Sequence, residues 1–305
     1  MDSRLKKLLL DEELYKRVQE VGQRKALSKQ SLIEKLNVNV KKISIDGLNG
    51  KYILKKSSRN QGIAGFASAN MYNSIDIQTP KLYLPKQNGL FSTQTFQKDI
   101  SEVDGLEIVL AENNLEYQQV ERCVFGRYKW QLFYDSDLKQ RLLSFMTKDC
   151  LEQLQNMYLV DELRSERDRW SQNFFLYRQK GSEKYEGVIV IDLEEMAIFN
   201  YCTGTKKADF DNFLYTSYYS PTPQQSDDYM CFAERMREII TLLDDGVLSK
   251  GNIEAIMKAL KYNFPKEFEQ ACEICNIHGK AKHYIADPIK RLWEYLNNTI
   301  GRELE

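Results

Sequence analysis

The middle of the chain places an acid, an amide and a second acid beside two apolar segments. Asp168 and Asn173 lie in one polar loop, and Asn173 leads directly into the apolar residues 174–176. A second apolar run, residues 188–191, ends directly before Asp192. Short apolar runs bounded by polar turns predict two buried strands. A carboxylate at the end of a buried strand needs a partner or a cation, so the pattern constrains both the local fold and the chemistry.

These three side chains have the chemistry that phosphoryl transfer requires, which is mainly positioning and neutralisation of charge. We expect Asp168 to be the catalytic base that accepts the proton of an attacking hydroxyl. We expect Asn173 and Asp192 to be ligands of Mg²⁺. The alternatives are a solvated aspartate at a helix end for Asp168 and a turn aspartate at a strand end for Asp192.

A basic segment between Arg24 and Arg59 stands out from a chain whose net charge is −1. The segment holds ten basic and two acidic residues, a balance of +8. Such a stretch favours a polyanion as partner: a nucleotide, a phosphoinositide, an inositol polyphosphate or a nucleic acid. The alternative is a solvated basic surface. No nucleic-acid-binding motif is recognisable in it, so we expect no nucleic-acid partner.

Length and composition are those of a globular chain. With 305 residues, 42% of them hydrophobic, the chain can bury a substantial core in one large or two modest domains. No apolar run approaches the roughly 18 residues of a transmembrane helix, and residues 8–10 are too short an apolar run for a signal peptide. Six scattered cysteines favour a reducing compartment. We therefore expect a cytoplasmic protein without a membrane span.

Hydrophobic periodicity divides the chain into three parts. We expect an N-terminal helical extension over 1–37, a small mixed lobe over 38–98 and a large helical lobe over 99–305. In the first two parts the expected helices are 3–22, 28–36 and 62–73, and the expected strands are 40–45, 51–55, 80–84 and 89–96. In the large lobe the expected helices are 137–146, 148–160, 229–244, 252–262, 266–278 and a last one capped by Asp287 and Pro288.

This order of elements resembles the protein-kinase-like superfamily over about residues 40–200. It resembles in particular the atypical bacterial branches of that superfamily: HipA-like kinases, phosphoinositide-kinase-like enzymes and pathogen effector kinases. Residues 97–99 look like the hinge between the lobes, Asp168 and Arg169 like the start of the catalytic loop, and residues 192–194 stand where D-F-G would stand. The resemblance implies an α+β class and a two-lobed fold with a small β lobe and a larger helical lobe.

Lys55 looks like the lysine that grips the α- and β-phosphates in that superfamily. It shares a strand face with Ile53, whereas Lys56 points to the opposite face, so Lys55 is preferred. The resemblance implies ATP and Mg²⁺ or Mn²⁺ as cofactors and Ser or Thr of a protein as substrate. It also implies a cytoplasmic location, or secretion into a host cytosol if the chain is an effector.

Several residues depart from the kinase pattern. Trp170 replaces the catalytic-loop histidine, Glu194 replaces the glycine of D-F-G, and Gly47 and Gly50 are not a full glycine-rich loop. Residues 62–73 contain no acid that would pair with the phosphate-gripping lysine. Another acid reaches Lys55, or the site is assembled only under some condition, such as binding of an inositol polyphosphate, or the chain is a pseudokinase.

Other functions stay open beside a protein kinase. The same fold serves lipid kinases and nucleotidyltransferases, and a pseudokinase would act as a scaffold that binds a polyanion. Separately, the C-x-x-C pair and the two histidines of the chain supply four zinc-capable ligands: Cys272, Cys275, His278 and His283. Their spacing is too short for a zinc finger, and both cysteines fit the buried stripe of a helix, so we expect core cysteines.

Overall fold

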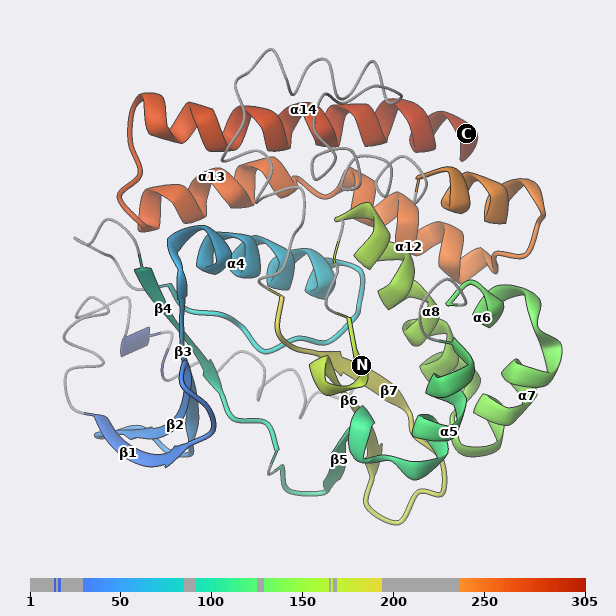
Figure 1. Cartoon of the computed structure of the whole chain (residues 1–305), viewed down its shortest axis with the longest axis horizontal. Helices are drawn as coiled ribbons and strands as arrows, with labels where there is room; N and C mark the ends of the chain where they lie inside the picture. Colours follow the sequence, from blue (N-terminus) through green and yellow to red (C-terminus); the bar gives the residue numbers. More distant parts are fainter. Residues whose placement is uncertain are drawn as a thin grey trace.

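The computed structural model describes residues 14, 16–17, 30–84, 92–101, 103–124, 129–164, 166, 169–193 and 236–305. A four-stranded antiparallel sheet lies at one end, and a mainly helical region with a second, three-stranded sheet forms the rest (Figure 1). The chain is therefore of the α+β class that the sequence predicts. Of the expected first helix, the described residues Leu14, Lys16 and Arg17 are helical.

The small sheet has the strand order β1 (Gln30–Lys35), β2 (Val40–Ile45), β3 (Tyr52–Ser58) and β4 (Ser92–Lys98). Its β2–β3 hairpin confirms the predicted pair of strands, with Val40 opposite Lys55 and Ile43 opposite Tyr52. The turn between them contains Gly47 at φ 74°, a backbone angle that favours glycine. One face of this sheet buries a core that includes Leu14.

Two predictions for the small lobe are wrong. The helix expected over 28–36 is strand β1 where it is described, since Leu32 pairs with Ile43 of β2. Hydrogen bonding to a neighbouring strand outweighs a weak local helix preference here. The strand expected over 80–84 is reduced to a single bridge, in which Tyr83 and Phe96 exchange backbone hydrogen bonds of 2.9 and 3.2 Å.

Helix α4 (Arg59–Ser74) follows β3 directly and confirms the helix predicted over 62–73. Its start is fixed by a capping box, in which the Ser58 hydroxyl accepts from the backbone of Gln61 and the Gln61 side chain accepts from Ser58. The helix packs against α13 (Phe264–Ile274) (Figure 1). Its buried residues belong to the main hydrophobic core and not to the core of the small sheet.

The second sheet lies in the large lobe and carries the acid–amide–acid region. Its order is β5 (Leu106–Leu110), β6 (Phe174–Gln179) and β7 (Gly187–Val190), all antiparallel. The predicted pair of strands, now β6 and β7, is confirmed. β5 is not among the predicted strands, although its mostly apolar residues follow a glycine, which is a usual strand signal.

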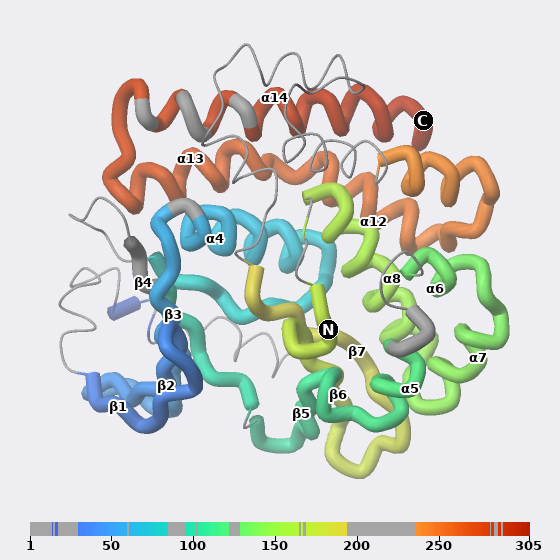
Figure 2. The backbone as a smooth tube through the Cα atoms, viewed as in Figure 1, coloured from blue at the N-terminus to red at the C-terminus, as the bar shows by residue number. Residues whose placement is uncertain are grey.

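Helices make up the rest of the large lobe: α5 (Leu115–Val124), α6 (Gln131–Tyr134), α7 (Ser136–Phe145), α8 (Lys148–Leu163), residues 236–244, α12 (Lys250–Lys261), α13 and α14 (Lys280–Glu303). The predictions of α7, α8, α12 and α13 are confirmed to within a few residues. The cap predicted at Asp287 and Pro288 is wrong, because α14 starts at Lys280 and both residues lie inside it. Its backbone runs beside α13 (Figure 2). No helix in these ranges has the length and apolar character of a membrane span.

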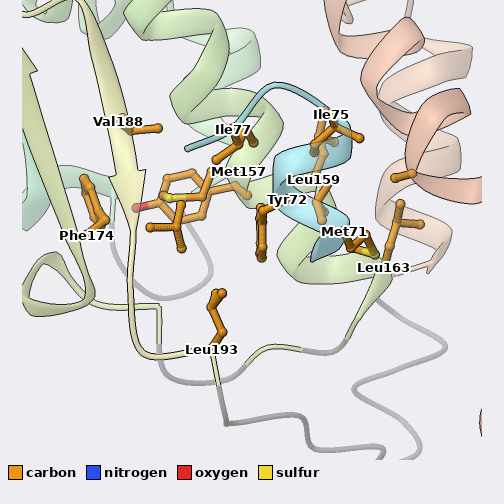
Figure 3. Close-up of a cluster of buried hydrophobic side chains, with 14 of the residues drawn as sticks. Met71, Tyr72, Ile75, Ile77, Met157, Leu159, Leu163, Phe174, Val188 and Leu193 are labelled. Carbon is orange, nitrogen blue, oxygen red and sulfur yellow. The ribbon is translucent and has the colours of Figure 1, made fainter. Parts of the chain in front are cut away.

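The main core joins α4 to the large lobe. Tyr72 of α4 lies among side chains of α8 and of the three-stranded sheet, including Met157 and Phe174 (Figure 3). Leu193, the residue after Asp192, is also buried in this cluster. The segment that carries Asp192 is therefore anchored in the same core as α4. The division of the chain at residues 37 and 98 stays a prediction.

Candidate functional site

A cavity of about 330 Å³ lies between the two sheets. Its walls come from β2, β3 and β4 on one side and from Phe175 and residues 191–193 on the other. Apolar side chains such as Ile53, Leu82 and Ile100 line much of it. This volume is at the lower end of the range of small-molecule sites, roughly 300–1,000 Å³. The cavity can therefore hold a flat apolar group such as a nucleotide base.

Lys55 and Asp192 meet in this cavity. The Lys55 ammonium donates to Asp192 Oδ1 in an ion pair that joins β3 to the end of β7. Both side chains are partly buried, with 27% and 33% of their surface exposed. Lys56 is exposed and is not part of the cavity wall. The structure thus brings together two residues that the sequence proposed as site residues, and it gives Lys55 an acidic partner that does not come from α4.

Asp192 has a left-handed backbone conformation, with φ 55°. This conformation costs a residue other than glycine roughly 1–2 kcal/mol. It persists only where the surrounding structure holds it, and such residues cluster at functional sites. The strain therefore marks Asp192 as a residue whose position is enforced by its neighbours.

Asn173 lies at the same end of the β6–β7 pair. It is buried, ends a short 3₁₀ turn and directly precedes β6. Its carbonyl oxygen accepts the backbone N–H of Ile191 at 3.1 Å. Phe174 and Val190, the next residues inward, are opposite each other in the sheet. The candidate metal ligands therefore lie at neighbouring strand ends, since Asn173 directly precedes β6 and Asp192 follows β7 by two residues.

Asp168 lies outside the described residues, so its role as catalytic base stays a prediction. Two of its neighbours are described. Arg169 is buried, and Trp170 is 48% exposed. Trp170 stands where the kinase pattern has histidine, and the structure places it at the surface beside the candidate site.

The predicted hinge, residues 97–99, forms part of the cavity wall. Asp99 pairs with Lys42 at 2.6 Å. Although burial opposes ionisation, hydrogen bonds from Lys42 and Ser101 lower the pKa of Asp99 below its ordinary value. Lys42 and Lys55 both belong to the basic segment. Two of its charges are thus neutralised by acids from other parts of the chain, which reduces the charge left for an external polyanion.

Helix α4 carries no acid that could pair with Lys55, and other contacts hold it in place. The Tyr72 hydroxyl donates to Asp161 Oδ1 of α8, and Asn70 donates to Glu267 of α13 at 2.8 Å. The absence of an acid in residues 62–73 therefore does not leave the helix without contacts that fix it. Burial of α4 in the main core, together with these hydrogen bonds, takes the place of the missing ion pair.

The four zinc-capable residues do not form a site. Cys272 and Cys275 are buried in the main core, whereas His278 and His283 are exposed. Burial raises the pKa of Cys272 to about 12 and that of Cys275 to about 11, and protonated thiols are poor ligands. Over the described ranges, no three His, Cys, Asp or Glu residues gather where they could hold a metal ion. Both cysteines are core residues, as expected.

The side chains at the cavity fit a magnesium nucleotide. Mg²⁺ prefers oxygen ligands, and the cavity wall offers the carboxylate of Asp192. The amide of Asn173 belongs to a buried residue next to this wall, whose carbonyl binds the backbone of Ile191. A lysine is a suitable partner for phosphate oxygens. The apolar part of the cavity accommodates a base. A lysine and a carboxylate in an apolar cavity are groups that could hold a nucleotide and its metal.

Comparison with known proteins establishes the fold. No protein family model matches the chain, and no curated protein matches its sequence. Solved structures do match. The crystal structure of the Helicobacter pylori proinflammatory kinase CtkA has a TM-score of 0.56 at 13% identity, and the match covers 89% of this chain and 94% of that one.

A structure of the toxin–antitoxin system HipA and HipB with operator DNA, from Shewanella oneidensis MR-1, has a TM-score of 0.50 at 13% identity. The match covers 95% of this chain and 71% of that chain. The chain therefore has the protein-kinase-like fold that the sequence predicted, with a likeness to atypical bacterial kinases. At this identity the likeness concerns the fold alone.

Four residues near the site were not singled out from the sequence: Tyr72, Asp161, Arg164 and Glu166. The segment 161–169 is rich in charges, which ordinarily indicates a solvated helix end. In the structure all four are buried. The only available signal was that Asp161 and Arg164 lie where the apolar stripe of α8 would continue, which is weak evidence by itself.

Proposed function

We propose that the protein is an ATP-dependent kinase that uses Mg²⁺ or Mn²⁺ and phosphorylates Ser or Thr side chains of proteins. One observation carries the proposal: Lys55 and Asp192 meet in a cavity between the two sheets, and the backbone of Asn173 binds that of Ile191 beside Asp192. The kinase-like fold supports it. A lysine, a carboxylate and an amide at these places match the needs of phosphoryl transfer.

In the proposed mechanism the apolar wall of the cavity binds the nucleotide base, and Lys55 binds the α- and β-phosphates. Asp192 and Asn173 would hold the metal, which when bound neutralises the negative charge of the phosphates. Asp168 would orient the acceptor hydroxyl and accept its proton. The protein thus contributes mainly positions and charges.

Lys55 would gain a second partner when nucleotide binds. In the structure its ammonium neutralises Asp192. Phosphate oxygens offer Lys55 an alternative partner of higher charge, and the Asp192 carboxylate is then released for the metal. Binding of nucleotide is therefore expected to prepare the metal site, so that metal binds more tightly when nucleotide is present.

A labelling experiment tests the proposed reaction. The protein is incubated with a protein mixture and Mg²⁺ or Mn²⁺, in parallel with ATP labelled at the γ- and at the α-phosphate. The proposal predicts label on protein Ser or Thr from γ-labelled ATP alone. Label from α-labelled ATP would show nucleotidyl transfer instead, and label on inositol lipid would show a lipid kinase.

The main alternative is a pseudokinase scaffold that binds a polyanion. The absence of an acid in residues 62–73 and the +8 balance of residues 24–59 favour it. An inositol polyphosphate or a phosphoinositide is the proposed ligand of that segment in either case. Calorimetry with inositol hexakisphosphate, combined with the labelling assay, separates the cases. Binding without any phosphoryl transfer supports the scaffold, and binding that raises transfer supports a regulated kinase.

A further inference from the structure

A group of charged side chains is buried behind the candidate site, and the proposed mechanism gives it no role. The group comprises Asp161, Arg164, Glu166 and Arg169, with the hydroxyl of Tyr72. Arg164 has no exposed surface, and Arg169 is 7% exposed. Burying charge is costly unless each group is paired and hydrogen-bonded.

Arg169 links three segments of the chain. Its guanidinium binds Asp161 of α8 through two contacts, Nε to Oδ2 at 3.0 Å and Nη2 to Oδ1 at 3.3 Å. Its Nη1 donates to the carbonyl of Asn173 at 2.8 Å and to the carbonyl of Ile191 at 2.9 Å. Asn173 is a candidate metal ligand, and Ile191 directly precedes Asp192. One rigid group therefore touches the backbone of both strands that carry the metal ligands.

Arg164 holds the other side of Asp192. Its Nη2 donates to the carbonyl of Leu193 at 2.7 Å, and its Nη1 donates to Glu166 at 2.7 Å. The carbonyls before and after Asp192 are thus each bound by a buried arginine. These contacts explain how Asp192 keeps its left-handed backbone, since the flanking peptides cannot turn without breaking charge-assisted hydrogen bonds.

Tyr72 connects this group to α4. Its hydroxyl donates to Asp161 Oδ1, and the guanidinium of Arg164 lies 3.4 Å from the same hydroxyl. Burial, and then the nearby Asp161 carboxylate, raise the pKa of Tyr72, so the hydroxyl stays protonated and acts as a donor. Asp161 therefore binds two partners: Tyr72 of α4, and Arg169, which binds the backbone next to both candidate metal ligands.

We propose that Arg169 is a positioning residue, which fixes the spacing between Asn173 and Asp192, and that Asp161 and Tyr72 couple this spacing to helix α4. The inference rests on the proposed function, because it takes Asn173 and Asp192 as metal ligands. In this arrangement α4 controls the metal site through its contacts with the large lobe. An arginine is required, because a lysine carries a single donor group and cannot bind both carbonyls and both carboxylate oxygens.

The test measures metal affinity directly. Binding of Mn²⁺ to the protein, saturated with a non-hydrolysable ATP analogue, is followed by the electron paramagnetic resonance signal of free Mn²⁺. Arg169→Lys keeps the charge and is expected to weaken Mn²⁺ binding by about tenfold or more, the usual effect of losing a residue that orients a ligand. Binding of the analogue without metal is expected to change little. In the labelling assay the KM for Mn²⁺ should rise while the KM for ATP stays near its wild-type value.

Arg178→Lys is the matched control. Arg178 of β6 also binds a carboxylate through two contacts, to Glu107 at 3.0 and 2.9 Å, but it lies on the surface away from the cavity. This variant should bind Mn²⁺ like the wild type. If Arg169→Lys does not fold, the test uses Tyr72→Phe instead, because this substitution removes only a hydroxyl. A several-fold loss of Mn²⁺ affinity is then expected.

The outcomes separate the two proposals. Wild-type Mn²⁺ affinity in Arg169→Lys, or in Tyr72→Phe where the first variant is unfolded, overturns the positioning role and leaves the kinase proposal standing. A loss of thermal stability without loss of Mn²⁺ affinity also overturns it. If the wild-type protein binds neither the analogue nor Mn²⁺ with it, the proposed function fails, and the positioning role fails with it.

Discussion

Lys55 of β3 and Asp192 at the end of β7 form an ion pair although 137 residues separate them in the chain. The pair spans the cavity between the two sheets. In the proposed kinase the same two residues serve different ligands, the lysine for phosphate and the aspartate for metal. Their contact in the structure shows that the fold alone brings both to one place.

Replacing Lys55 by alanine should weaken nucleotide binding, because a charge-assisted contact to phosphate is lost. Hydrogen bonds to charged groups contribute about 1.5–3 kcal/mol, which corresponds to roughly 10- to 100-fold in affinity. Calorimetric titration with ATP and Mg²⁺ measures the change. Lys56→Ala is the control, since the exposed Lys56 should contribute at most about 0.5 kcal/mol. Equal, small effects of both variants would identify a different phosphate ligand.

The parts of the fold that the sequence predicted are those with a regular apolar period. The β2–β3 hairpin has a glycine turn between two apolar strands, and β6 and β7 are apolar runs next to polar loops. Because side chains alternate between the two faces of a strand, the sequence also predicted that Lys55, and not Lys56, faces the cavity. β2 and β3 alternate between more and less buried residues, whereas all of β7 is buried, so in each case the apolar residues reflect the burial of the strand.

The parts that were missed lack such a pattern. Every residue of β1 is exposed, so its sequence shows no alternation, and it is a strand only because β2 offers a partner. Nearly all of α8 from Cys150 onward is buried. The charged residues at its C-terminal end are therefore not separated into a buried face and an exposed face that the sequence would show. Of the partners of Asp161, Arg164 and Arg169 are close in sequence, whereas Tyr72 is 89 positions away, a contact that a single sequence does not reveal.

Replacing Asp168 by alanine should lower turnover and leave nucleotide binding intact. Its proposed task is to accept the proton of the attacking hydroxyl, and general-base groups typically contribute about 10²- to 10⁴-fold to the rate. Thermal shift with ATP and Mg²⁺ reports binding, and initial rates with γ-labelled ATP report turnover. Loss of the thermal shift in this variant, or an unchanged rate, would assign the base to another residue.

Replacing Asp99 by asparagine should remove a pH-dependent part of the stability. Because the folded-state pKa of Asp99 is lowered, its contribution is present above the unfolded-state pKa of about 3.9 and is lost as pH falls below that value. The free energy of unfolding of the wild type should therefore exceed that of the variant at pH 7, and the difference should shrink below about pH 4. Urea unfolding at several pH values measures it. A difference that stays constant with pH would show that the pair of Asp99 with Lys42 is not its source.

The most direct test of the central claim is phosphoryl transfer by the variant Asp192→Ala. The transfer of label from γ-labelled ATP to protein is measured in a single turnover for the wild type and the variant, with circular dichroism to establish that both are folded. We predict transfer by the wild type with Mg²⁺ or Mn²⁺ and none above background by the folded variant, because the carboxylate that would hold the metal is gone. Transfer at the wild-type rate by folded Asp192→Ala would contradict the assignment of the cavity as the active site.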